Sequence, residues 1–388
     1  MPQKISPSIR SDIDPFIAMD VVARAAKLSG QGEDIISMAV GQPGAPAPAS
    51  AREAAKRQIE SGSIGYTSAP GIEGLRTRIA SHYREKYQVE INPQRIFATT
   101  GSSAGFLLAF LSMFDEGARI AIPSPGYPAY RNIIKALSMV PVEIETDPES
   151  RWTLSAQLLE QTHKKEKLDG VLFANPNNPN GTMLERDPFA ALLKCAEELG
   201  IRFISDEIYH GLTYTMKETC ALEFVDDAVI INSFSKYYCM TGWRIGWMIV
   251  PQTLIRTIDR LQQNLFICAP EISQVAAQAA FDGVEEMETV RQTYVDNRQL
   301  FLERLPILGI TEIQPIDGAF YAYGNITALS DNSMELANEI LACCGVALTP
   351  GLDFDLNRGE SWMRFSFAGN HQRMIEGFDR LDHWLGRR

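Results

Sequence analysis

The middle of the chain alternates short, mostly apolar runs with amphipathic stretches of helical length. The apolar runs occupy residues 95–100, 120–123, 170–174, 201–206 and 228–232, and small or polar residues follow them at once. Such runs are typical of buried strands, and their regular alternation with helices predicts an α/β protein with a parallel sheet. Enzymes with parallel sheets bind ligands in the crevice at the carboxyl ends of the strands, so the residues just after each run are the candidates for a site.

The segment 233–247 carries the strongest chemical signal. Lys236 follows the apolar run 228–232, with Ser233 before it and Arg244 after it. A lysine amine in a partly desolvated pocket loses its proton easily and can form a Schiff base with an aldehyde. Serine and arginine are residue types that hold a phosphate. An aldehyde that carries a phosphate and binds a lysine describes pyridoxal phosphate (PLP). The alternative interpretation is a solvated lysine beside a structural arginine.

A second strand end carries an acid. Asp206 closes the run 201–206, and Tyr209 follows three residues later. A buried carboxylate needs a cationic partner or a hydrogen-bonding network. The protonated pyridine nitrogen of PLP would be such a partner, and a carboxylate there keeps the cofactor an effective electron sink. The alternative is a structural carboxylate that caps the following residues.

Further candidates lie at other turns. Tyr127 follows the run 120–123 and could stack on a flat cofactor, whereas core packing competes for Tyr130. Ser102 and Ser103 lie in a tight turn, 101–104, before an apolar helix at 105–114, and the free backbone N–H groups at a helix start form a phosphate site. Arg364 lies within an apolar strand pattern and therefore requires an anion, either a protein acid or a substrate carboxylate.

Length and composition set limits on the class of protein. A chain of 388 residues exceeds one typical core, so two domains are expected. A net charge of −12 disfavours nucleic acid or anionic membrane as the main partner, and no apolar run reaches the length of a membrane span or a signal-peptide core. The six cysteines show no disulfide or metal-ligand spacing, so we expect no metal site and a reducing, cytoplasmic setting.

Taken together, these residues resemble the fold-type I PLP-dependent aminotransferases of class I/II, the aspartate aminotransferase superfamily. The most specific matches are two motifs: residues 175–181, Asn-Pro-Asn-Asn-Pro-Asn-Gly, and residues 233–244, Ser-Phe-Ser-Lys through Gly242-Trp-Arg. Asp206-Glu-Ile-Tyr209 and the segment 66–76 match further motifs in the family's order, and the match extends from Gly41 to Arg364.

The resemblance implies a fold and an activity. It implies a large domain with a mixed, mostly parallel seven-stranded sheet sandwiched by helices, and a smaller α/β domain from both chain ends. The expected division is 1–45 for the N-terminal segment of the small domain, 46–275 for the PLP domain and 276–388 for the C-terminal part. The implied reaction moves an amino group between an L-amino acid and a 2-oxo acid by a ping-pong mechanism. It also implies a homodimer with active sites at the interface.

The resemblance assigns roles at the cofactor ring. Lys236 would form the Schiff base and move the proton between substrate and cofactor, and Asp206 would pair with the pyridinium nitrogen. Asn178 and Tyr209 would hydrogen-bond the phenolic oxygen, and Tyr127 would stack on the ring. These roles suit the general base, the electron sink and the fixed orientation that the chemistry needs.

It also assigns two anion sites. The implied phosphate ligands are Ser102, Ser103, Ser233, Arg244 and Tyr66, the last reaching across from the second subunit. Arg364 would bind the substrate α-carboxylate, helped by the Gly41 backbone and the Asn178 amide.

The sequence departs from the family's pattern at two positions, and two alternative functions remain open. Asn180 replaces the family's usual threonine, and Ser103 stands where some aspartate-using relatives carry lysine, which disfavours a strict preference for aspartate. A PLP-dependent C–S β-lyase would use the same residues, and a non-catalytic PLP-binding regulator is the alternative of another class. Specificity is expected to involve Phe16, Ile17, Val40 and the loop 266–273.

Overall fold

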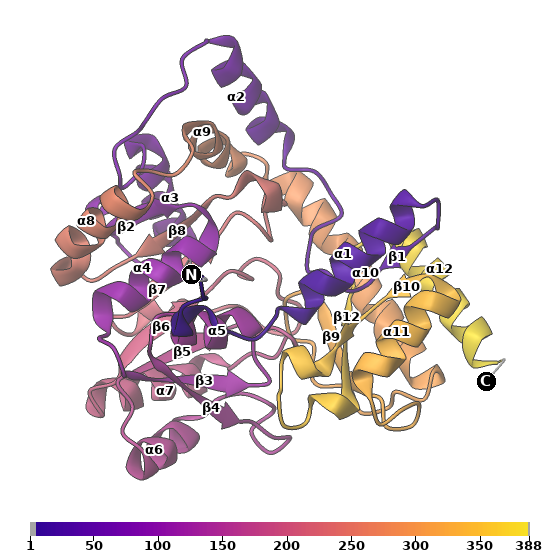
Figure 1. Cartoon of the computed structure of the whole chain (residues 1–388). Helices are drawn as coiled ribbons and strands as arrows, with labels where there is room; N and C mark the ends of the chain where they lie inside the picture. Colours follow the sequence, from indigo (N-terminus) through magenta and orange to yellow (C-terminus); the bar gives the residue numbers. More distant parts are fainter. Residues whose placement is uncertain (1–4, 387–388) are drawn as a thin grey trace.

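The computed structural model describes residues 5–386, and its centre is a seven-stranded sheet (Figure 1). The strand order is β2-β8-β7-β6-β5-β3-β4; β8 runs antiparallel to β2 and β7, and the remaining neighbours are parallel. The strands are β2 (Ile96–Thr99), β3 (Arg119–Ser124), β4 (Val140–Glu145), β5 (Gly170–Ala174), β6 (Arg202–Asp206), β7 (Val229–Ser233) and β8 (Gly246–Ile249). This mixed sheet confirms the predicted fold class.

Helices cover both faces of this sheet because its inner strands are apolar on both sides. In β5, Val171 and Phe173 belong to one apolar cluster and Leu172 to another, as the two-residue period of a strand requires. The first cluster includes residues of α2 (Ala49–Glu60), α3 (Glu73–Tyr87), α6 (Ala156–Lys165), α7 (Arg186–Glu198) and α9 (Glu271–Ala280). The second includes residues of α4 (Gly101–Met113), α5 (Pro128–Ala136) and α8 (Ile255–Leu265).

A smaller unit combines both ends of the chain. Its three-stranded sheet has the order β11-β12-β9, and in a second, two-stranded sheet β1 pairs in parallel with β10. The elements are α1 (Ile17–Gly30), β1 (Ile36–Ser37), α10 (Val284–Ile307), β9 (Tyr321–Asn325), α11 (Ser333–Cys344), β10 (Val346–Ala347), β11 (Thr349–Pro350), β12 (Trp362–Ser366) and α12 (His371–Leu385). Figure 1 shows α1 and β1 beside the yellow C-terminal elements. The division at residues 45 and 275 stays a prediction.

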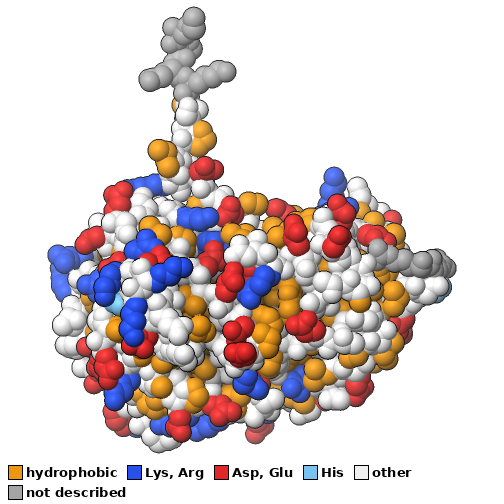
Figure 2. All heavy atoms as spheres, turned by 90° about the horizontal axis from the view of Figure 1, so that it is seen from below, with side chains coloured by type: hydrophobic (Ala, Val, Ile, Leu, Met, Phe, Trp, Pro, Cys, Tyr) orange, Lys and Arg blue, Asp and Glu red, His pale blue; other side chains and the backbone are white. Residues whose placement is uncertain are grey.

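The surface is mixed in charge. On the face shown in Figure 2, acidic and basic side chains are interspersed around scattered apolar atoms. Within residues 5–386, no helix combines the length and hydropathy that a membrane span needs.

Candidate active site

One cavity of about 290 Å³ brings together most of the residues that the sequence analysis selected. It lies where β2, β3, β5, β6 and β7, which run in the same direction, end, as expected for a parallel-sheet enzyme. The predicted residues that line it are Gly41, Ser102, Ser103, Tyr127, Asn178, Asp206, Tyr209, Lys236, Arg244 and Arg364.

Lys236 lies three residues beyond β7, and its side chain is directed into the cavity. Its Nζ donates a hydrogen bond to the carbonyl of Gly41 at 2.7 Å. Burial lowers the pKa of the amine to about 8, and the positive charges of Arg364 and Arg244 act in the same direction, while Asp206 opposes them. The amine is therefore uncharged in an appreciable fraction of molecules near neutral pH, which is the form that attacks an aldehyde.

Asp206 ends β6 at the floor of the cavity and is 3% exposed. One carboxylate oxygen accepts a hydrogen bond from the hydroxyl of Tyr130, and the other accepts the N–H of Ile208 at 3.0 Å. Burial raises the pKa of Asp206 to about 6, while these hydrogen bonds and Lys236 act in the opposite direction. The carboxylate is thus fixed in place but lacks a full cationic partner, which suits a protonated ring nitrogen.

Arg364 lies in the middle of β12 and is 2% exposed. Its Nη1 donates to Asn178 Oδ1 at 2.9 Å, and Nη2 donates to the carbonyl of Ala39. The rings of Tyr321 and Phe354 cover the guanidinium, with centroids 4.4 and 4.5 Å from its central carbon. Nε is buried without a hydrogen-bond partner, and no carboxylate within residues 5–386 forms an ion pair with this side chain. A buried guanidinium with a spare donor is suited to a substrate carboxylate.

The start of α4 and Arg244 form a cradle for an anion. Ser102 and Ser103 lie in the first turn of the helix, where backbone N–H groups have no partner within the helix. Gly101 has φ +73°, and a Cβ there would clash with the Arg244 guanidinium. Glycine therefore lets the guanidinium approach the helix start, and the donor set fits a phosphate.

Two predicted phosphate ligands lie outside the cavity in this chain. The hydroxyl of Ser233 donates to Ser235 Oγ at 2.9 Å and lies 3.1 Å from the Ile245 carbonyl, and it is Ser235 that lines the cavity. The side chain of Tyr66 is 84% exposed. The phosphate roles of Ser233 and Tyr66 stay predictions.

Tyr321, Ser235 and the hydroxyl of Tyr130 also contribute to the site, and none of them was predicted from the sequence. The hydroxyl of Tyr321 lies 2.9 Å from that of Tyr209, and its ring packs on Arg364. Ser235 directly precedes the lysine, so the motif itself contains the signal for it. Tyr130 lies one helical turn after Tyr127, and their rings pack edge to face at 5.2 Å.

The expected specificity residues separate into two groups. Phe16 and Val40 line the cavity, together with Ala18, Met19 and Val22 of α1. Ile17 and the loop 266–273 do not contribute to its lining in this chain.

A second cavity, of about 560 Å³, is lined by charged side chains that pair with one another. Its basic residues pair with its acidic ones: Lys86 with Glu218 at 2.5 Å, Arg291 with Glu288 at 2.7 Å, and Arg78 with Glu85 at 3.2 Å. Its charges are thus satisfied internally, and we assign it no chemistry. Within the described part of the chain, no group of three His, Cys, Asp or Glu residues is placed to hold a metal.

Comparison with known proteins decides the family. The family model for aminotransferase class I and II matches residues 33–381. The chain belongs to the class I and II aminotransferases. The valine–pyruvate aminotransferase of Mycobacterium tuberculosis is 42% identical over 97% of this chain and 98% of that protein. The (5-formylfuran-3-yl)methyl phosphate transaminase of Methanocaldococcus jannaschii is 35% identical over 97% and 98%. A crystal structure of an aminotransferase from M. tuberculosis, 41% identical, covers 99% of this chain and is itself fully covered, with a TM-score of 0.96.

This aminotransferase depends on PLP, as its family does, and uses an amino acid and a 2-oxo acid as substrates. The site fits the cofactor at three points: an amine with a lowered pKa at Lys236, an unpaired carboxylate at Asp206 and an anion cradle at α4. The predicted activity and cofactor are therefore confirmed.

Proposed function

We propose that this aminotransferase takes the amino group from L-amino acids with uncharged aliphatic side chains and transfers it to a small 2-oxo acid. The observation that supports this is the apolar wall of the cavity, made by Phe16, Ala18, Met19, Val22 and Val40. A substrate side chain that contacts this wall gains by burying apolar surface, whereas a charged one loses its hydration.

The cations in the cavity support the same substrate class. Lys236, Arg244 and Arg364 are the basic side chains among its described lining residues. We assign them to the cofactor aldehyde, the phosphate and the substrate α-carboxylate, so none remains for a distal carboxylate. The name of the relative from M. tuberculosis, a valine–pyruvate aminotransferase, agrees with this class.

We assign the catalytic roles to the residues that the geometry groups together. PLP supplies an electron sink for the charge that develops at the substrate Cα. Arg364 and Asn178 orient the α-carboxylate, so that the Cα–H bond faces Lys236, whose uncharged amine takes the proton. Asp206 would hold the ring nitrogen protonated, and Tyr127 and Tyr209 would hold the ring in place.

We further propose a homodimer that shares its active sites. Tyr66 is exposed in a loop, and other apolar residues are exposed in the segments before it and before α9, namely Ile59, Ile64, Leu265 and Ile267. Thr67 N–H to Cys268 Sγ at 3.4 Å and Gly65 N–H to Glu271 Oε2 at 2.6 Å hold this loop against the start of α9. An exposed apolar group of this kind is suited to a subunit interface, from which Tyr66 would reach the partner's phosphate site.

The setting we propose is the cytoplasm. All six cysteines are unpaired thiols, which is the usual state in a reducing compartment. Five of them are partly or fully shielded from solvent.

The substrate class is tested by the ratio of kcat/KM values. We expect valine, isoleucine and leucine to exceed aspartate and lysine by about 100-fold with pyruvate as acceptor, because a charge against the apolar wall lacks a partner. 2-Aminobutyrate, which has a shorter side chain and gives a product distinct from pyruvate, serves as the control and should fall between the two groups. Equal kcat/KM values for aspartate and valine would contradict the proposal.

A further inference from the structure

Residues 351–359, which form most of the connection between β11 and β12, contact both halves of the active site; we call them the 351–359 loop. The ring of Phe354 covers the guanidinium of Arg364 at 4.5 Å. The carbonyl of the same residue accepts the N–H of Gly126 at 3.0 Å, and Gly126 directly precedes Tyr127. One residue thus connects the side chain assigned to the substrate carboxylate with the turn that carries the tyrosine at the cofactor.

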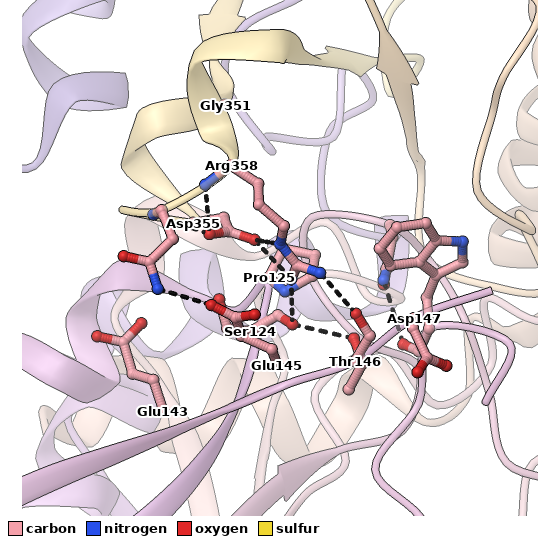
Figure 3. A network of polar contacts seen from close by, with 12 residues as sticks. Ser124, Pro125, Glu143, Glu145, Thr146, Asp147, Gly351, Asp355 and Arg358 are labelled. Atoms are coloured by element: carbon pink, nitrogen blue, oxygen red, sulfur yellow. Dashed lines mark hydrogen bonds and ion pairs between the residues drawn. The ribbon is translucent and has the colours of Figure 1, made fainter. Parts of the chain in front are cut away.

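Arg358 anchors this loop to the large sheet. Its Nη2 donates to the carbonyl of Ser124 at 3.0 Å, and its Nη1 donates to the carbonyl of Thr146 at 2.8 Å (Figure 3). These carbonyls lie at the carboxyl ends of β3 and β4. The fixed fork of a guanidinium can bind both, which the single ammonium group of lysine does less well.

Asp355 holds the arginine in position. Its Oδ2 accepts from Arg358 Nε at 2.8 Å, and its Oδ1 accepts the N–H groups of Asn357 and Arg358 at 3.0 Å each. The carboxylate is 2% exposed, so water screens its contact with the arginine only weakly. The indole of Trp152 covers the guanidinium at 5.6 Å. Nε of Arg358 is thus held within the loop, while Nη1 and Nη2 donate to the large sheet.

Further hydrogen bonds hold the Ser124 carbonyl in place. It also accepts the N–H of Thr146 at 2.9 Å and the hydroxyl of the same residue at 3.0 Å. Because the acceptors of Arg358 in the large sheet are backbone groups at strand ends, no side-chain rotation there can move them. Arg358 thus joins the loop to two fixed points of the sheet, and the contact of Asn357 Nδ2 with Glu145 Oε1 at 2.6 Å adds a further anchor beside it.

We propose that Arg358 is a positioning residue for substrate binding. By fixing the 351–359 loop to β3 and β4, it holds Phe354, and through it Arg364, at a set distance from the cofactor site. This inference rests on the proposed function, in which Arg364 binds the substrate carboxylate. The cofactor ligands Ser102, Asp206 and Lys236 follow strands of the large sheet, so a loosened loop should weaken substrate binding and spare cofactor binding.

The experiment compares Arg358→Met with a matched control, Arg380→Met. Arg380 is also an arginine of the smaller unit in a network of ion pairs, with Asp34 and Glu376, and its side chain is 25% exposed against 30% for Arg358. Arg380 makes no contact with the loop or the cavity lining. The readouts are KM and kcat for the amino acid that reacts fastest, the PLP dissociation constant of the apoenzyme, and Tm.

We expect Arg358→Met to raise KM for the amino acid and the oxo acid about tenfold, the effect of losing charge-assisted hydrogen bonds worth about 1.4 kcal/mol. The PLP dissociation constant should stay within about twofold of the wild-type value, since Ser102, Asp206 and Lys236 lie outside the loop and Tyr127 keeps its packing against Tyr130. Arg380→Met should leave KM and the PLP dissociation constant unchanged. Arg358→Lys keeps the charge and one donor group and should give an intermediate KM. It replaces Arg358→Met in the comparison if the methionine variant does not fold.

Three outcomes would overturn the inference. In the first, Tm falls in Arg358→Met while KM equals that of Arg380→Met, which shows a purely structural role. In the second, the PLP dissociation constant rises in parallel with KM, which shows a general loosening of the site. The third comes from Arg364→Met: an unchanged KM there removes the proposed carboxylate role and the inference with it. If Arg364→Met raises KM and Arg358→Met does not, only the positioning role fails.

Discussion

At the scale of single residues, Lys236 shows how the surroundings set the chemistry. An exposed lysine has a pKa near 10.4 and is almost wholly protonated at neutral pH. Here burial is the largest cause of the lowered pKa, and the charges of Arg364 and Arg244 add to it. The two arginines that bind anions in our account therefore also keep the amine reactive before the anions arrive.

This state of Lys236 predicts how the apoenzyme takes up PLP. With a pKa of about 8, the uncharged fraction rises about fivefold between pH 7 and pH 8 and levels off above about pH 9. The rate of PLP incorporation, followed by absorbance after rapid mixing, should show the same plateau. The reaction of PLP with free lysine is the control, because it shows how the titration of PLP itself changes the rate with pH. A rate that keeps rising tenfold per pH unit to pH 10 would indicate an ordinary lysine pKa.

At the scale of elements, most of the large sheet could be predicted from the sequence. Each inner strand is a continuous apolar run bounded by polar turns, so its type and place depend on local sequence. Asp206 and Lys236 could be found for the same reason, since each lies at or just after the end of such a run. The strands β10 and β11 could not be predicted, because they are two residues long and too short to show a period.

The remainder of the site depends on packing between distant segments. The carboxylate of Asp353 accepts the N–H groups of Ile17 at 3.1 Å and Ala18 at 2.9 Å, and so fixes the start of the helix that forms the apolar wall. Phe354, in the connection between β11 and β12, and Tyr321, the first residue of β9, both cover Arg364. No local pattern relates these residues, because their contacts exist only once the two ends of the chain have folded together into the smaller unit.

At the scale of the whole molecule, the proposed dimer predicts complementation between two damaged chains. Tyr66→Phe should weaken PLP binding about fivefold to tenfold by removing one charge-assisted hydrogen bond. Lys236→Ala should be inactive. In a hybrid dimer, the chain with the Tyr66→Phe substitution keeps its lysine and receives the intact tyrosine of its partner, so one site has a full set of residues.

The hybrid is made by co-expressing the two variants with different affinity tags, and it is compared with each parent at limiting PLP. We expect the hybrid to bind PLP at one site with the wild-type dissociation constant and to have more activity per intact lysine than Tyr66→Phe alone. If the activity of the hybrid only equals that of Tyr66→Phe diluted by the inactive chain, each chain completes its own site. A molecular mass of one chain in solution would lead to the same conclusion.

The measurement that tests the central claim most directly is the absorbance of the PLP-loaded enzyme with a single amino acid and no acceptor. Transamination at Lys236 predicts that valine converts the cofactor band to that of the aminated cofactor and releases the 2-oxo acid once per site. Pyruvate should then restore the original band and form alanine, and Lys236→Ala should do neither. A band that persists while ammonia and an oxo acid accumulate over many turnovers would contradict the account and indicate a lyase.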